Sequence, residues 1–196
     1  MNGLNMAAVY LVQTLGSLYL LVVLLRFILQ LVRADFYNPL SQFIVRATAP
    51  LLTPMRKAIP GFAGIDFASL VLAVLVQLVL IGLIIKLMGA ALPGVLQMLV
   101  WSLVGVTALF IKIFFFALIA SVILSWVAQG SHNPAVILVH QICEPILAPI
   151  RKIIPSLGGL DLSPIFGFIA LRLVDMLVVT NLAIATGMPR GLTLAL

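Results

Sequence analysis

Three residues that could do chemistry fall on one helical face near position 140. His140, Cys143 and Glu144 are spaced three and four residues apart, so their side chains would be neighbours on an α-helix. Together with His132 they could bind a metal or a haem, or His140 and Cys143 could form a nucleophilic pair. No further ligand completes the set, and Pro145 follows at once. We expect hydrogen-bonded residues at a membrane surface, with a cofactor ligand or a nucleophile as the alternatives.

Other signatures of catalysis are missing from the sequence. It contains no H-E-x-x-H, no G-x-S-x-G, no P-loop and no dinucleotide-binding fingerprint. Its single cysteine allows neither an intramolecular disulfide nor a C-x-x-C metal site. The sequence therefore predicts a protein that is not an enzyme and that binds no metal and no cofactor.

A second group of charged residues lies inside long apolar runs: Arg26, Lys112, Arg172 and Asp175. A charge at the centre of a membrane costs about 2.5 to 3.5 kcal/mol on the more lenient scale, so such residues are usually paired. Counted from one side of the membrane at about 1.5 Å per residue, Asp175 lies roughly 18 Å deep and Lys112 roughly 21 Å deep. The two could therefore pair, or Arg172 could pair with Asp175 at i, i+3. Three cations and one anion sum to +2, so the anion cannot neutralise all the cations. The remaining cations could snorkel to the membrane surface, line an ion path or pair with an acid from a partner subunit.

The apolar runs that hold these charges identify a membrane protein. The chain is 64% hydrophobic and 8% charged, with a mean hydropathy of +1.31, whereas soluble domains carry about 25% charged residues. A membrane-spanning helix needs about 20 apolar residues. Four runs are long enough, and we expect the first to be a retained span and not a cleaved signal. The runs are 6–32, 67–88, 95–127 and 165–187.

The polar segments between the runs repeat each other at an offset of 95 residues. Between Asn38 and Asp66, 11 of 29 positions are identical to the residue 95 positions later. Matching polar and proline positions are not expected from composition alone, so the chain contains an internal duplication, with repeats at 1–92 and 93–196. The motif residues are Asn38, Pro39, Pro50, Pro54, Arg56, Lys57, Pro60 and Asp66 in the first repeat, and Asn133, Pro134, Pro145, Pro149, Arg151, Lys152, Pro155 and Asp161 in the second.

Each repeat contains two spans, so the two repeats must have the same orientation. The motif segments carry six basic side chains, at Arg33, Arg46, Arg56, Lys57, Arg151 and Lys152, against Lys86 and Arg190 on the other side. The positive-inside rule then predicts cytoplasmic motif segments, with both termini on the opposite side of the membrane. The net charge of +6 is spread among apolar residues, which argues against nucleic acid as a partner.

The motif segments have the pattern of short amphipathic helices. Asn38 and Asn133 are predicted N-caps, each followed by a proline at the first helical position. The two internal prolines of each segment predict a break in the helix, followed by a second short helix. That helix would turn an apolar face to the membrane and its Arg-Lys pair to anionic headgroups. Asp66 and Asp161 are the predicted N-caps of the spans that follow.

The same residues resemble the YggT family of small integral membrane proteins, also called YlmG-like. The resemblance covers both repeats and is complete in the second, where Trp126 and Glu144 belong to the pattern; the first repeat has Leu31 and Ala49 at those positions. It implies a protein of the bacterial inner (plasma) membrane, with periplasmic termini and without enzyme activity. Relatives in bacteria and chloroplasts are linked to osmotic tolerance, cell division, envelope organisation and assembly of a haem-bearing cytochrome.

These observations predict an all-α integral membrane protein with four transmembrane helices from two parallel repeats, each with a proline-broken amphipathic segment between its helices. As function we expect a non-catalytic membrane scaffold or assembly factor with a basic cytoplasmic platform. Its partners would be anionic lipids of the inner leaflet and a membrane protein. The alternative is a small channel or transporter component for osmotic balance, and the third hypothesis is a haem-handling factor that uses His132 or His140.

Overall fold

The computed structural model describes residues 3–62, 64–128, 130–154, 161–189 and 192, and these residues form helices and connecting turns with no β-strand among them. Only an isolated bridge, between Phe62 and Ile65, joins two extended residues. The helices are α1 (Gly3–Leu31), α2 (Pro39–Ala58), α3 (Phe67–Leu87), α4 (Val95–Val127), α5 (Pro134–Ile153), α6 (Ser163–Val174), the π-helix η1 (Asp175–Thr180) and α7 (Asn181–Ala185).

Four of these elements are long and apolar enough to cross a membrane. They are α1 with 29 residues, α3 with 21, α4 with 33, and the continuous helix Ser163–Ala185 with 23. At about 1.5 Å per residue, even α3 is about as long as the hydrocarbon core is thick. The four predicted spans are thus confirmed, and they coincide with the four apolar runs of the sequence.

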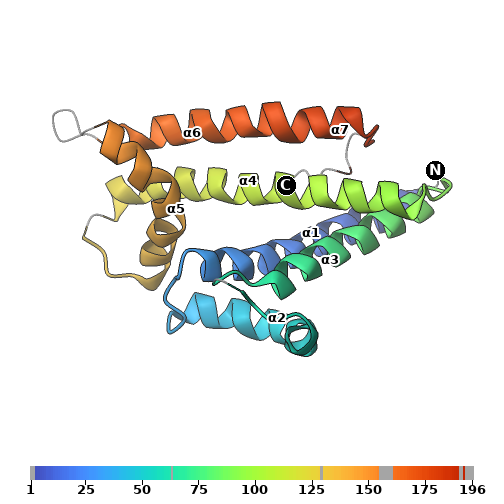
Figure 1. The fold of residues 1–196 in the computed structure, drawn as a ribbon, viewed down its shortest axis with the longest axis horizontal. Helices are drawn as coiled ribbons and strands as arrows, with labels where there is room; N and C mark the ends of the chain where they lie inside the picture. Colours follow the sequence, from blue (N-terminus) through green and yellow to red (C-terminus); the bar gives the residue numbers. More distant parts are fainter. Residues whose placement is uncertain (1–2, 63, 129, 155–160, 190–191, 193–196) are drawn as a thin grey trace.

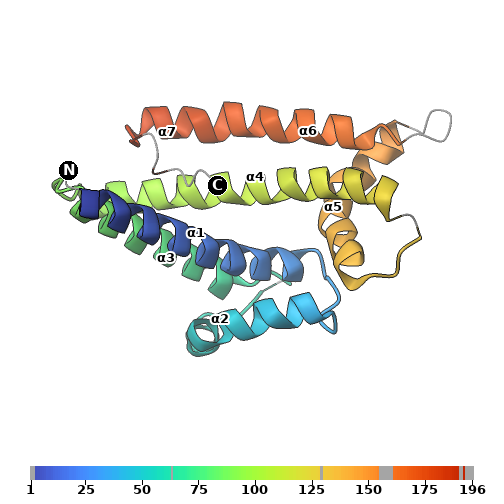
Figure 2. The same cartoon turned by 180° about the vertical axis from the view of Figure 1, so that it is seen from behind.

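The two repeats are parallel, as predicted. Figure 1 shows α1 and α4 running toward the same end of the bundle, where α2 and α5 lie, and α3 and α6 running back from it. The view from behind shows the same order, with α4 between the pair α1–α3 and the outer helix α6–α7 (Figure 2). We call the end that holds α2 and α5 the motif end.

The motif helices are continuous, and the predicted break at the internal prolines is wrong. α2 runs through Pro50 and Pro54, and α5 runs through Pro145 and Pro149. Each proline removes one backbone donor and crowds the preceding turn, which bends a helix without necessarily ending it. Because the two prolines of a helix are four residues apart, they lie on the same side and bend the axis the same way. Figure 1 shows the result in α2, whose last turns are seen end-on.

The core is shared between the two repeats. The largest cluster of buried residues joins α1, α2, α3, α4 and α5, with Leu24, Ile28, Leu52 and Leu109 almost fully buried. A second cluster, around Trp101, joins α3, α4 and η1. The cluster between α4 and α5 of the second repeat is small and consists of Leu118, Cys143 and Leu147. Most side chains of α6 and η1 point outward. The second repeat is therefore the more open of the two.

Candidate functional site

Each motif helix begins at the predicted asparagine cap. Asn38 Oδ1 accepts a hydrogen bond from the backbone N–H of Leu40 at 2.9 Å, and Asn133 Oδ1 accepts one from Ala135 at 2.9 Å. Pro39 and Pro134 occupy the first helical position, where no backbone donor is needed. The caps predicted from local sequence are therefore confirmed in both repeats.

The asparagine of the first repeat also contacts the second repeat. Asn38 Nδ2 donates a hydrogen bond to the backbone carbonyl of Pro134 at 2.7 Å. Close by, the backbone N–H of Asp35 donates to Oε1 of Gln141 at 3.3 Å. These two bonds join the segment at the start of α2 to α5, and the two helices also touch each other. The two motif helices thus meet near their first turns at the motif end and run apart from there (Figure 1).

An ion pair in the first repeat ties the end of α2 to the start of α3. Arg56 is paired with Asp66, and the same carboxylate accepts a hydrogen bond from the hydroxyl of Ser69 and one from its backbone N–H at 3.3 Å. Asp66 is the N-cap of α3, as predicted, and only 3% exposed, whereas the Arg56 side chain is 37% exposed. Burial alone would raise the pKa of Asp66, but the bonds from Arg56 and Ser69 outweigh it and hold that pKa below its ordinary value. We call Arg56–Asp66 the first clamp.

Arg26 lies behind the first clamp at the end of α1. Its side chain is 8% exposed, and its guanidinium carbon lies 5.0 Å from the ring centre of Phe36, within the range of a cation–π contact. Its Nε and Nη1 have no hydrogen-bond partner among the described residues. Arg26 is therefore buried against the ring of Phe36, and it has no ion pair among the residues that the structure describes.

The second repeat has an equivalent clamp that is open to solvent. Arg151 Nε bonds Asp161 Oδ2 at 3.0 Å, and Arg151 Nη1 bonds Glu144 Oε2 at 3.0 Å. The Arg151 and Asp161 side chains are 43% and 42% exposed. Burial would raise the pKa of Asp161, but bonds from Ser163 and the charge of Arg151 keep that pKa below its ordinary value. We call Arg151–Asp161 the second clamp.

The prediction that Asp161 caps the next span is close to the observed geometry but one residue early. The N-cap of α6 is Leu162, and Asp161 Oδ1 accepts a hydrogen bond from the backbone N–H of Ser163 at 2.9 Å. Pro60 follows the end of α2. Its partner in the second repeat, Pro155, lies outside the described residues, so its predicted role stays a prediction.

Beside the second clamp lies a cavity of about 520 Å³ between α4, α5 and α6. Two short hydroxyl side chains, Ser121 and Ser125, line its α4 side, and His140 lines its α5 side. Its apolar lining includes Trp126, whose ring is 76% exposed. Residue identity between the repeats does not predict this cavity, because the cavity depends on which side chains are small.

The arginine and the lysine of each motif do different things. Arg56 and Arg151 are held in clamps, whereas Lys57 and Lys152 are exposed and have no ion pair among the residues that the structure describes. Arg46, about three turns before Lys57 on α2, is also exposed. The basic face predicted from the Arg-Lys pairs therefore consists mainly of lysines.

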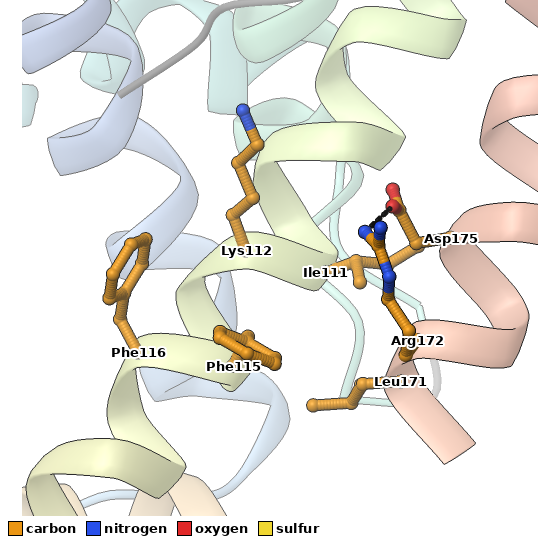
Figure 3. A pocket seen from close by; sticks show the side chains of 7 residues that line it. All are labelled: Ile111, Lys112, Phe115, Phe116, Leu171, Arg172 and Asp175. Carbon is orange, nitrogen blue, oxygen red and sulfur yellow. Dashed lines mark hydrogen bonds and ion pairs between the residues drawn. The ribbon is translucent and has the colours of Figure 1, made fainter. Parts of the chain in front are cut away.

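Charges within the spans gather around a cavity of about 250 Å³ between α4 and the α6–η1 helix. Figure 3 shows Arg172 and Asp175 joined by an ion pair of 3.0 Å on one helix, with Lys112 extending from the facing helix. Of the two pairings left open by the sequence, the structure has the ion pair at i, i+3. Asp175 also begins the π-helix η1, a local widening that is common at functional sites.

The histidines do not form a metal centre in the described part of the chain. No group of three or more His, Cys, Asp or Glu side chains there could hold a metal ion. His140 Nδ1 lies 3.2 Å from the Ser121 hydroxyl, and His132 is exposed. Cys143 is fully buried, and burial is the main cause that raises the pKa of its thiol to about 11, which makes it a poor nucleophile.

Fold and site define a class: a multi-pass helical membrane protein of two parallel repeats, each with a motif helix clamped to the next span. The family model described as CCB3/YggT matches residues 5–87 and 100–182. This chain belongs to the CCB3/YggT family.

Similar proteins occur in several bacteria. The chain is 70% identical over 197 residues to an uncharacterised protein of Pseudomonas aeruginosa, covering all of both chains. It is 42% identical over 170 residues to one of Vibrio alginolyticus, covering 86% of this chain and 91% of that protein. It is 36% identical over 170 residues to YggT of Escherichia coli, covering 85% and 86%. No solved structure matches the chain.

Proposed function

We propose that the protein is a non-catalytic scaffold or assembly factor of the bacterial inner membrane, with the motif end in the cytoplasm as its contact surface. The observation that carries the proposal is the junction of the two motif helices. The bond from Asn38 to the Pro134 carbonyl joins α2 and α5 across the repeats. Both helices are also joined by an ion pair to the spans that follow them, which favours the fixed arrangement that a docking platform requires.

The lysines of this platform provide its attraction for acidic groups. Lys57 and Lys152 project from the last turns of their helices, and Arg46 adds a third exposed cation. A basic group near an anionic membrane surface contributes about 1 kcal/mol, and salt screens this attraction. The partners that fit are anionic headgroups and an acidic segment of a second membrane protein.

The test measures binding of a fluorescent phosphatidylglycerol to the purified protein in neutral detergent. The double variant Lys57→Gln, Lys152→Gln should bind it about ten- to thirtyfold more weakly, from about 1 kcal/mol per charge. The difference should shrink as salt rises. Lys86→Gln is the matched control, because Lys86 lies in the last turn of α3 at the opposite end, and it should change little. Equal losses in the double variant and the control would refute the platform.

The proposal also predicts that crosslinking in native membranes captures a membrane protein through α2 or α5.

The cavity in the spans favours a second candidate, a small channel or transporter component. Lys112, Arg172 and Asp175 line it at mid-membrane depth, and intramembrane charges often mark ion pathways. That function predicts ion flux in proteoliposomes which changes with Asp175→Asn and ignores the lysine variants. Reproducible flux of this kind, with unchanged lipid and partner binding in the lysine variants, would replace the scaffold proposal.

A further inference from the structure

The space beside the clamp is filled by side chains in the first repeat and is open in the second. In the first repeat, Arg26 and Gln30 of α1 reach toward the clamp, and Gln30 Oε1 accepts from Arg56 at 3.4 Å. Their counterparts 95 residues later are Ser121 and Ser125, which lack the length to fill the space. The cavity of about 520 Å³ is lined by these two serines. A position that one repeat closes with its own side chains is thus left open in the other.

The arginine of the open site is already paired. Among the described residues Arg151 is the cation that lines the cavity, and it is bonded to Asp161 Oδ2, also in the lining, and to Glu144 Oε2, outside it, each at 3.0 Å. The two carboxylates and the guanidinium together carry a charge of −1, and Asp161 is the anion that faces the cavity. The pKa of Asp161 lies below its ordinary value because of its bonds to Ser163 and Arg151, which outweigh the effect of burial. An anionic group would therefore meet a saturated arginine and an excess of acceptors, whereas a cation would be attracted.

The polar lining adds acceptors for a group with N–H donors. The cavity contains the hydroxyls of Ser121 and Ser125 and the ring of His140, besides the carboxylate of Asp161. Trp126 presents an exposed indole at its edge, and an indole is the best aromatic partner for an ammonium group. A primary ammonium can donate three hydrogen bonds, as a lysine does.

The position of the cavity indicates a lipid. It lies at the last turns of α4 and the first turns of α6, between residues that end one span and residues that begin another. The level is that of the headgroups in a membrane. Leu147, Ile165 and Phe168 continue the lining with apolar surface, which suits the start of an acyl chain.

We propose that the cavity of the second repeat binds the headgroup of a phospholipid with a primary ammonium group, a phosphatidylethanolamine. The ammonium lies among Asp161, Ser125 and Trp126, and the acyl chains leave along the apolar side of α4 and α6. This site differs from the lysine surface of the platform, since its carboxylate and hydroxyls bind the ammonium of a zwitterionic headgroup, whereas the lysines bind an anionic one. It does not depend on the scaffold proposal.

The test is lipid retention by the detergent-purified full-length protein in native mass spectrometry, with three lipids of equal chain length. Phosphatidylethanolamine should be retained most strongly. Phosphatidylcholine has a quaternary ammonium without N–H donors, and phosphatidylglycerol has no cation, so both should be retained less. Equal retention of the three lipids, or strongest retention of phosphatidylglycerol, would overturn the proposal.

The duplication supplies a matched control. Trp126→Ala removes the indole and should weaken retention of phosphatidylethanolamine about two- to fivefold, the range for an exposed cation–π contact. Leu31→Ala alters the equivalent exposed position of the first repeat, where no such site is proposed, and should leave retention unchanged. Glu144→Gln reduces the negative charge without touching the cavity wall, and should also weaken it. Loss in Leu31→Ala as large as in Trp126→Ala, or no loss in both Trp126→Ala and Glu144→Gln, refutes the site.

The same experiment separates this site from the platform. The variants Lys57→Gln and Lys152→Gln should leave the retention of phosphatidylethanolamine unchanged even where they weaken phosphatidylglycerol binding. Parallel loss of both lipids in the lysine variants would show a single unselective surface, and would overturn the cavity as a separate site.

Discussion

The two clamps have the same residues at the same offset but should differ greatly in what they contribute to stability. Replacing Asp66 by Asn keeps the shape of the side chain and removes its charge. Breaking a buried pair by removing one partner costs about 3 to 5 kcal/mol. Asp66 is 3% exposed, but Arg56 is 37% exposed and keeps part of its hydration. We therefore expect Asp66→Asn to lower the free energy of unfolding by about 2 to 3 kcal/mol.

The equivalent change in the second repeat is the control. Both partners of the second clamp are more than 40% exposed, and an exposed ion pair contributes about 0 to 1 kcal/mol. Asp161→Asn should therefore cost less than about 1 kcal/mol. The assay is reversible unfolding in mixed micelles with increasing denaturing detergent. A loss for Asp161→Asn as large as that for Asp66→Asn would refute the argument from burial.

The pH dependence provides an independent check of the first clamp. The pKa of Asp66 lies below its ordinary value because the bonds from Arg56 and Ser69 outweigh the effect of burial. A carboxyl with a lowered pKa stabilises the fold fully above its ordinary pKa near 3.9, and the contribution is lost as the pH falls through the lowered value. The difference between wild type and Asp66→Asn should thus be constant from about pH 5 to pH 8 and shrink only below about pH 4. A difference that changes near neutral pH would contradict the assignment.

Two further predictions concern orientation and packing. Tyr37→Cys places an exposed thiol at the motif end, and Ala90→Cys places one at the opposite end. An impermeant maleimide added to intact spheroplasts should label only the Ala90→Cys variant. Cys143 should not react, because it is buried and burial raises the pKa of its thiol to about 11. Labelling of Tyr37→Cys alone would reverse the orientation. Gly16→Ala puts a Cβ against the side-chain end of Leu80 on the facing helix, which must shift; the change should cost about 1 kcal/mol of unfolding free energy, the low end for overpacking. Gly94→Ala, with open space around it, should cost little, and equal costs would show that α1 and α3 are not closely packed there.

The parts of the fold that depend on local sequence could be predicted. The four spans follow from the length of the apolar runs, and the caps at Asn38 and Asn133 follow from a side chain that reaches its own helix two residues on. The parallel orientation of the repeats follows from two spans per copy. None of these features depends on how distant segments pack.

The motif helices show where a local rule fails. Proline disfavours the interior of a helix, which led to the prediction of a break at Pro50 and Pro54. In the structure the neighbours of these prolines are held by the core: Ile44, Thr48 and Leu52 are buried. Packing of this apolar stripe compensates for the missing backbone bonds, so tertiary contacts override the local preference.

The clamps and the cavity could not be deduced from spacing alone. Arg56 and Asp66 are ten residues apart, and they meet because the intervening turn folds back, with Gly64 at φ 82° and a short bridge at Phe62. The sequence does contain a signal for the cavity, which is a difference in side-chain size between equivalent positions of the repeats. At the offset of 95 residues, the long Arg26 is paired with the short Ser121.

The bond between Asn38 and Pro134 has a consequence for the history of the chain. Two identical subunits related by a twofold axis must make each interface contact twice, once from either side. Here the amide of Asn38 donates to the other repeat, whereas the side chain of Asn133 accepts a bond within its own helix. Two copies joined in one polypeptide are free of that obligation. The first copy can thus carry a buried clamp while the second carries an exposed one.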